Sequence, residues 1–118
     1  MELLHFEGTA EELYRDLPDL LEDKLTMLNF PYDDEGPSCI HGVQLRLYYS
    51  SHKCTLDEAM EGFVKELYGL ATFLGEAYGY SEYTIEGFYI HSMRMGGHDI
   101  REIIKSLNGQ YVHFVMEF

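Results

Sequence analysis

Hydrophobic and polar residues change their spacing along the chain, and each spacing predicts one element. The run 43–49 alternates apolar and polar residues, which is typical of a strand. Thr55 and Glu58 follow with the spacing of a helix capping box. Apolar residues then recur at intervals of three and four from Leu56 to Leu74. This pattern predicts a long amphipathic helix that begins after Thr55 and covers a sheet.

The first residues predict a strand followed by a helix. Residues 1–6 are mostly apolar and are followed by Gly8, which suits a short strand. Thr9 and Glu12 repeat the capping pattern, so a helix should begin at Ala10.

Pro18 leaves two alternatives for that helical region, because a proline inside a helix removes a donor and clashes with the preceding turn. Either one kinked helix runs to about Leu28, or a short helix ends near Asp16 and a second begins with Pro18 at its first position. We favour two helices, because one stripe of the second would hold all its leucines: Leu20, Leu21, Leu25 and Leu28, together with Leu17.

The residues after this helical region predict a loop, two strands, a helix and a last strand. Prolines, glycines and acidic residues mark 29–42 as a long loop. Residues 78–95 alternate as two strands around a turn at Glu86 and Gly87. Asp99 is placed to cap a helix that Gly109 ends, and residues 111–118 alternate as a last strand.

Together these elements predict an α+β fold. The expected order is β-α-(α)-β-α-β-β-α-β, with a mixed sheet of four to five strands and helices packed mainly on one face. With 118 residues, the chain fits a single compact domain over 1–118.

Composition and the first residues indicate where in the cell the protein is expected. No apolar run is long enough to span a membrane, and the first residues lack the basic flank of a signal peptide. The two cysteines, Cys39 and Cys54, are expected to be free thiols. We therefore expect a cytoplasmic protein.

Charge is the least ordinary property of the chain, at −13 overall. Residues 1–35 contain eleven acidic and two basic side chains, a net −9. Direct binding of nucleic acid or of an anionic membrane needs a basic surface, which eight lysines and arginines among 21 acidic residues do not provide. A one-signed acidic surface instead favours attraction of a basic protein.

The expected partner-binding residues combine this acid with tyrosines, whose apolar ring and polar tip suit interfaces. A solvated surface would explain the carboxylates equally well. The residues assigned to partner binding are Asp16, Asp19, Glu22, Asp23, Asp33, Asp34, Glu35, Tyr78, Tyr80 and Tyr83.

A metal site is considered and not expected, so no cofactor is predicted. Two cysteines and two histidines can bind zinc, and Cys39, His41, His52 and Cys54 offer that set. However, the strand between the two pairs would hold them apart by about 20 Å. Ordinary strand-end and surface residues explain the four better.

Catalytic patterns are weak. His91, His98 and His113 lie near Asp99 in the sequence, which is the minimum for acid–base work, but no serine has a nucleophile-elbow context. Residues 96–99 form a glycine-rich turn before a helix, where Asp99 would itself occupy the donors that a phosphate needs. We expect no enzyme activity.

These observations favour a non-enzymatic acidic interaction protein. It would bind the basic surface of a nucleic-acid-handling protein, with carboxylates placed where phosphates lie, as an anti-CRISPR type of inhibitor encoded by a phage or mobile element would. One alternative is a small-ligand- or metal-binding domain. Another is a homo-oligomeric interaction module.

Overall fold

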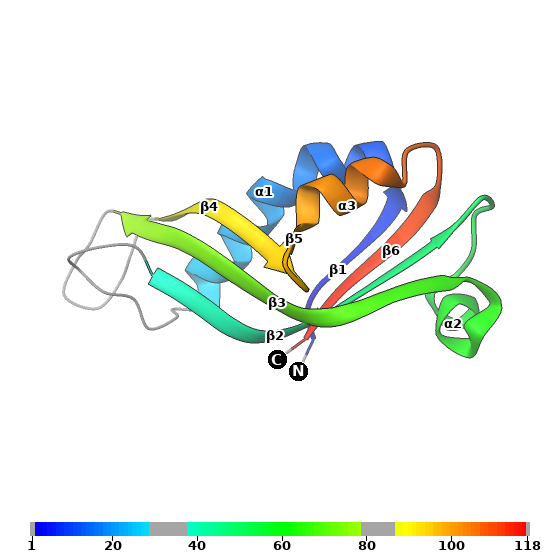
Figure 1. Ribbon diagram of the computed structural model, residues 1–118, viewed down its shortest axis with the longest axis horizontal. Helices are drawn as coiled ribbons and strands as arrows, with labels where there is room; N and C mark the ends of the chain where they lie inside the picture. The colour runs from blue at the N-terminus through cyan, green and yellow to red at the C-terminus, as the bar shows by residue number, and fades with distance from the viewer. Residues whose placement is uncertain (1, 29–37, 79–86, 118) are drawn as a thin grey trace.

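The computed structural model describes residues 2–28, 38–78 and 87–117, which form one antiparallel sheet with helices on it (Figure 1). The helices are α1 (Ala10–Leu28), α2 (Leu56–Glu58), which continues into a π-helical turn η1 (Ala59–Phe63), and α3 (Ile100–Ser106). The strands are β1 (Glu2–Thr9), β2 (Ser38–Ser50), β3 (Lys65–Tyr78), β4 (Gly87–Met95), β5 (His98–Asp99) and β6 (Tyr111–Glu117).

Within the described ranges, the sheet has six strands in the order β1-β6-β2-β3-β4-β5. Every neighbouring pair is antiparallel. The α+β class is therefore confirmed, while the expected mixed sheet of four to five strands is wrong in detail. The first and last strands pair with each other, from Glu2 with Glu117 to Thr9 with Tyr111, so the two ends of the chain lie side by side (Figure 1).

Alternation along each strand gives the sheet two different faces. One face packs against α1 and α3 (Figure 1) and forms the main core, where Leu45, Phe73 and Phe114 are fully buried. The leucines of α1 at positions 13, 17 and 21 are also fully buried against it. We call the opposite face, which carries the intervening residues of every strand, the open face.

The long helix predicted after Thr55 is wrong beyond its first turns. The capping box is present, with Glu58 N–H donating to the Thr55 hydroxyl at 3.2 Å. The helical turns end at Gly62, whose φ of +92° is favourable for glycine. Residues 65–78 form β3 instead, which pairs with β2 and β4 at once.

The helix was predicted over part of β3 because the spacing of apolar residues in a helix and in a strand coincides at some positions. Residues four apart, such as Leu67 and Ala71, lie on one side of a helix and also on one side of a strand. In β3 the alternation continues through Ala71 and Phe73, which are fully buried, while Leu70 and Leu74 are exposed. A pairing partner on each side satisfies the backbone of this central strand.

Pro18 does not divide the first helix. A single α1 extends from Ala10 to Leu28 with Pro18 inside it, so the favoured two-helix interpretation is wrong. A helix-interior proline costs about 3 kcal/mol. Burial of a leucine side chain contributes about 1.5–3 kcal/mol, and α1 buries three of them against the sheet, which offsets that cost.

The boundaries of the remaining elements agree with the prediction in some places and differ in others. The strand expected over 43–49 begins earlier, at Ser38, so part of the predicted loop is strand. The predicted cap at Asp99 is confirmed, because its carboxylate accepts from Arg101 N–H at 2.8 Å. The predicted strand before Glu86 lies outside the described residues, and Gly87 begins β4. In the described ranges, no helix has the length and apolar character needed to cross a membrane.

Candidate functional site

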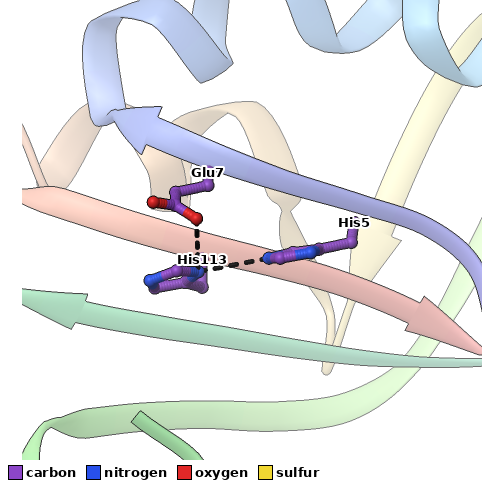
Figure 2. A group of neighbouring side chains, drawn as sticks. All are labelled: His5, Glu7 and His113. Carbon is purple, nitrogen blue, oxygen red and sulfur yellow. Dashed lines mark hydrogen bonds and ion pairs between the residues drawn. The ribbon is translucent and has the colours of Figure 1, made fainter. Parts of the chain in front are cut away.

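The antiparallel register of β1 and β6 gathers two histidines, a glutamate and a tyrosine on the open face. Glu7 is paired directly with His113, and Thr9 with Tyr111. His5 lies two residues before Glu7 on the same strand and therefore on the same face. His5 Nε2 is 3.2 Å from His113 Nδ1, and the nearer oxygen of Glu7 is 4.0 Å from that nitrogen (Figure 2).

His113 is fully buried although it projects from the open face. The segment 51–64, which connects β2 to β3 and includes α2, packs over this part of the face, where Ala59 contacts a small core formed with Tyr48 and Val115. His113 Nε2 lies 2.8 Å from the backbone carbonyl oxygen of Cys54 in the same segment. A carbonyl only accepts, so Nε2 carries the proton and Nδ1 of the neutral ring presents a lone pair.

Tyr111 holds the other side of the Glu7 carboxylate. Its hydroxyl donates to Glu7 Oε1, whereas Glu7 Oε2 is the oxygen that faces His113. This hydrogen bond from Tyr111 lowers the pKa of Glu7 below its ordinary value, and the nearby histidines add to the effect. Burial, together with the same hydrogen bond, raises the pKa of Tyr111 to about 12.

The arrangement presents two imidazole nitrogens and a carboxylate oxygen to one point. The ligand atoms of His5, Glu7 and His113 all lie within 4.8 Å of one another. Among the described residues, no other group of three histidine, cysteine or acidic side chains is arranged to hold an ion. Such a set can share a proton between its nitrogens or bind a metal ion.

His5, Glu7 and Tyr111 are not among the site residues predicted from the sequence. A signal was present, because His5 and Glu7 alternate in the first strand and Tyr111 and His113 alternate in the last. Only the pairing of β1 with β6 makes four residues from opposite ends of the chain into one group.

The predicted acidic residues of α1 have different roles. Asp16 forms a hydrogen-bonded ion pair with Arg15 at 2.9 Å, which lowers the pKa of its carboxyl. Glu22 accepts a hydrogen bond from the backbone N–H of Ile90 at 3.3 Å and so ties α1 to β4. Asp19 and Asp23 are exposed on α1.

Of the remaining predicted partner residues, Tyr78 alone lies in the described part of the chain. Tyr78 belongs to the open face of β3 and stacks on Tyr89 of β4, with ring centroids 4.5 Å apart. It thus lies on the face opposite α1 and its carboxylates. Five predicted residues lie outside the described part of the chain, namely Asp33, Asp34, Glu35, Tyr80 and Tyr83.

Tyr78 is part of a larger exposed surface on β3 and β4. We define the exposed strip as five apolar or aromatic residues of the open face that are 38–60% exposed. One aromatic member also contacts a charged neighbour, since the guanidinium of Arg46 lies 5.2 Å from the ring centroid of Tyr68. The members are Tyr68, Leu70, Leu74, Tyr78 and Tyr89.

The zinc candidates considered in the sequence lie at opposite ends of β2. Cys39 pairs with Leu74 near the start of the strand, whereas Ser50, after which His52 and Cys54 follow, pairs with Tyr111 at its end. Ser50 is eleven positions after Cys39 along the strand, or roughly 35 Å at about 3.3 Å per residue. The structure describes only the backbone of Cys39 and His41, and Cys54 is a partly buried free thiol whose pKa is raised by burial.

The histidines considered for acid–base work have separate partners. His91 lies 3.5 Å from Glu76, with both side chains more than half exposed. His98 is exposed in β5, and Asp99 caps α3. His113 belongs to β6, which β2 and β3 separate from the strand that carries His91. The two strands are about 14 Å apart across the sheet, at about 4.8 Å per strand. His113 also lies level with Glu66 of β3, whereas His91 lies beside Leu74, about eight residues farther along that strand.

Comparisons of the chain with protein-family models, with curated proteins and with solved structures find no match. The geometry and charge of the molecule itself therefore carry the functional argument.

Proposed function

We propose that this is a non-enzymatic interaction protein that binds a positively charged surface of another protein through the exposed strip. The observation that carries the proposal is the exposed strip itself, on a chain of net charge −13. Burial of apolar area drives protein association. The members of the strip lie on β3 and β4, whose pairing in the sheet holds these side chains on the surface.

The strip has the composition of an interface. Three of its five members are tyrosines, whose rings give apolar area and whose hydroxyls give a hydrogen bond at little cost in conformational entropy. Leu70 is the most exposed member, at 60%, and it lies between Tyr68 and Leu74 on the same face of β3. Large exposed apolar patches of this kind are typical of binding sites.

Charge selects the class of partner. Glu66 and Glu76 are exposed on the same face of β3 as the strip, while Asp19 and Asp23 contribute to the long-range field from the helical side. A second copy of this chain would bring another −13 to the interface, which opposes self-association, whereas a basic surface would be attracted. A nucleic-acid-handling protein has such a surface, and the carboxylates would then stand in for phosphates.

The experiment compares two matched variants that each add a carboxylate at an exposed apolar residue. Leu70→Glu changes the strip, and Met60→Glu changes η1, where Met60 is 59% exposed outside the strip. Each tagged protein, with wild type, is used to isolate partners from the native host. We expect wild type and Met60→Glu to retain the same basic protein and Leu70→Glu to lose it.

Two further measurements make the result decisive. Binding of the purified partner should weaken steeply from about 0.1 M to about 1 M salt, because the screening length falls from about 10 Å to about 3 Å. Duplex DNA should compete with this protein for the partner. An acidic partner, or binding that Leu70→Glu leaves intact, contradicts the proposal. A dimer in sedimentation equilibrium that Leu70→Glu dissociates would replace it with the homo-oligomer alternative.

A further inference from the structure

We propose that His5, Glu7 and His113 bind a divalent transition-metal ion of the zinc class. This proposal is independent of the exposed strip, because the three ligands lie on β1 and β6 and the strip lies on β3 and β4. Two imidazoles with one carboxylate are a ligand set that Zn²⁺ and Fe²⁺ use in proteins.

The distances suit an ion held between the side chains. Zn–N bonds of about 2.0–2.1 Å in tetrahedral geometry place neighbouring ligand nitrogens about 3.3 Å apart. His5 Nε2 and His113 Nδ1 are 3.2 Å apart. The oxygen of Glu7 lies 4.0 Å from His113 Nδ1 and within 4.8 Å of the His5 nitrogen, so it needs to approach the two nitrogens by up to about 1.5 Å. Glu7 is on the edge strand with its side chain 42% exposed, so it can turn about its hydrogen bond to Tyr111 to make that movement.

Two of the three ligands are already held by the groups that support metal ligands in proteins. A metal-binding histidine usually donates its second ring N–H to a carbonyl or carboxylate, which fixes the tautomer. His113 does this, since its Nε2 lies 2.8 Å from the Cys54 carbonyl oxygen and its Nδ1 faces the site. Tyr111 bonds Oε1 of Glu7 and leaves Oε2 directed toward His113.

The ion would take the place of a proton. The ring planes of His5 and His113 are inclined by 20°, with centroids 5.4 Å apart, and Figure 2 shows their nitrogens directed at each other. Because His113 Nδ1 accepts, His5 Nε2 donates the N–H of this contact. Metal binding then requires His5 to move its proton to Nδ1 and to tilt, so that both lone pairs converge. His5 is only partly buried, which permits the tilt.

The burial of His113 favours binding of one metal ion at a defined position over general attraction of ions to a charged surface. His113 is fully buried beneath segment 51–64, so its lone pair has only the other two ligands before it. Glu7 is exposed on the other side and gives the ion a route from solvent. Three protein ligands leave a fourth position for water, as in zinc sites that remain open.

The test uses Zn²⁺ and Co²⁺ with the purified, chelator-treated chain. Calorimetry with Zn²⁺ should give one ion per chain, and Co²⁺ should give the visible absorption bands of a low-coordinate nitrogen and oxygen site. Because His113→Ala removes a buried side chain, the variants that carry the test are His5→Gln and Glu7→Gln, whose side chains are partly buried and exposed. Each should weaken Zn²⁺ binding by more than about tenfold and reduce the Co²⁺ bands.

Matched controls distinguish this site from histidines elsewhere. His52→Gln removes an exposed histidine outside the group and should leave affinity and spectrum unchanged. Tyr111→Phe should weaken binding by about 10–100-fold through the freed Glu7 oxygen, the usual effect of losing a supporting group. Failure of Zn²⁺ to bind at one equivalent overturns the proposal. So does binding that His5→Gln leaves unchanged, or binding that His52→Gln abolishes.

Discussion

One face of the sheet carries a buried histidine at one end and exposed leucines and tyrosines at the other. His113 of β6 is fully buried and Leu70 of β3 is 60% exposed, although both project away from α1 and α3. The difference comes from segment 51–64, which folds over Tyr48 and Val115 beside His113. Alternation in a strand thus decides the face of a side chain, and the path of a connecting segment decides its environment.

The largest test of this comparison uses two adjacent residues of β3. Phe73 is fully buried on the helical face and Leu74 is 38% exposed on the other. We expect Phe73→Ala to lower the free energy of unfolding by about 3–5 kcal/mol, through lost burial and the cavity left behind. Leu74→Ala should cost less than about 1 kcal/mol. Urea denaturation of both variants measures the two values, and equal losses would mean that the strip is covered in solution.

A second prediction concerns histidines on the two ends of the open face. His113→Ala removes the donor to the Cys54 carbonyl and should cost about 1–3 kcal/mol in chelator-treated protein, because the carbonyl is left without its partner. His91→Ala loses only an exposed pair with Glu76 and should change stability by less than about 0.5 kcal/mol. If the two losses were equal, segment 51–64 would not bury His113 as described.

The cap of α2 tests how strongly segment 51–64 is held against the open face. Thr55 accepts from Glu58 N–H, and the Glu58 carboxylate accepts from Thr55 N–H, both at 3.2 Å. We expect Thr55→Ala to cost about 1 kcal/mol and to speed amide hydrogen exchange in residues 55–64 more than in β3. Thr9→Ala, at the equivalent cap of α1, is the control that should leave exchange in 55–64 unchanged.

Capping residues and alternating strands were the predictable part of this fold. The boxes at Thr9 and Thr55, the Asp99 cap and the last strand depend on contacts between residues a few positions apart. The identity of β3 was not predictable in this way, since four-residue spacing fits both a helix and a strand. Its neighbours β2 and β4 decide the outcome by pairing with both of its edges.

The candidate site was less predictable than the fold. His113 was considered with His91 and His98 because the three are close in sequence, yet the histidine that it contacts, His5, is 108 positions away. The acidic set illustrates the reverse. Asp16 and Glu22 count equally toward net charge, but one pairs with Arg15 and the other accepts from Ile90 N–H. The number of charges in a sequence does not distinguish a carboxylate that joins two elements from one in an exposed ion pair.

The last prediction concerns the end of the open face that segment 51–64 covers, and it uses Tyr111→Phe. Burial and the bond to Glu7 raise the pKa of Tyr111 to about 12, above its ordinary value of about 10 in an unfolded chain. Below pH 10 both states keep the proton, so the contribution of this group to stability is fully present. Between about pH 10 and 12 only the unfolded state loses it, and stability falls by at most about 1.4 kcal/mol per pH unit. Tyr111→Phe should lack this part of the alkaline loss, whereas Tyr68→Phe, in the exposed strip, should retain it. Urea denaturation across that pH range, with chelator present, measures the difference, and parallel curves for all three proteins would contradict the hydrogen bond between Tyr111 and Glu7.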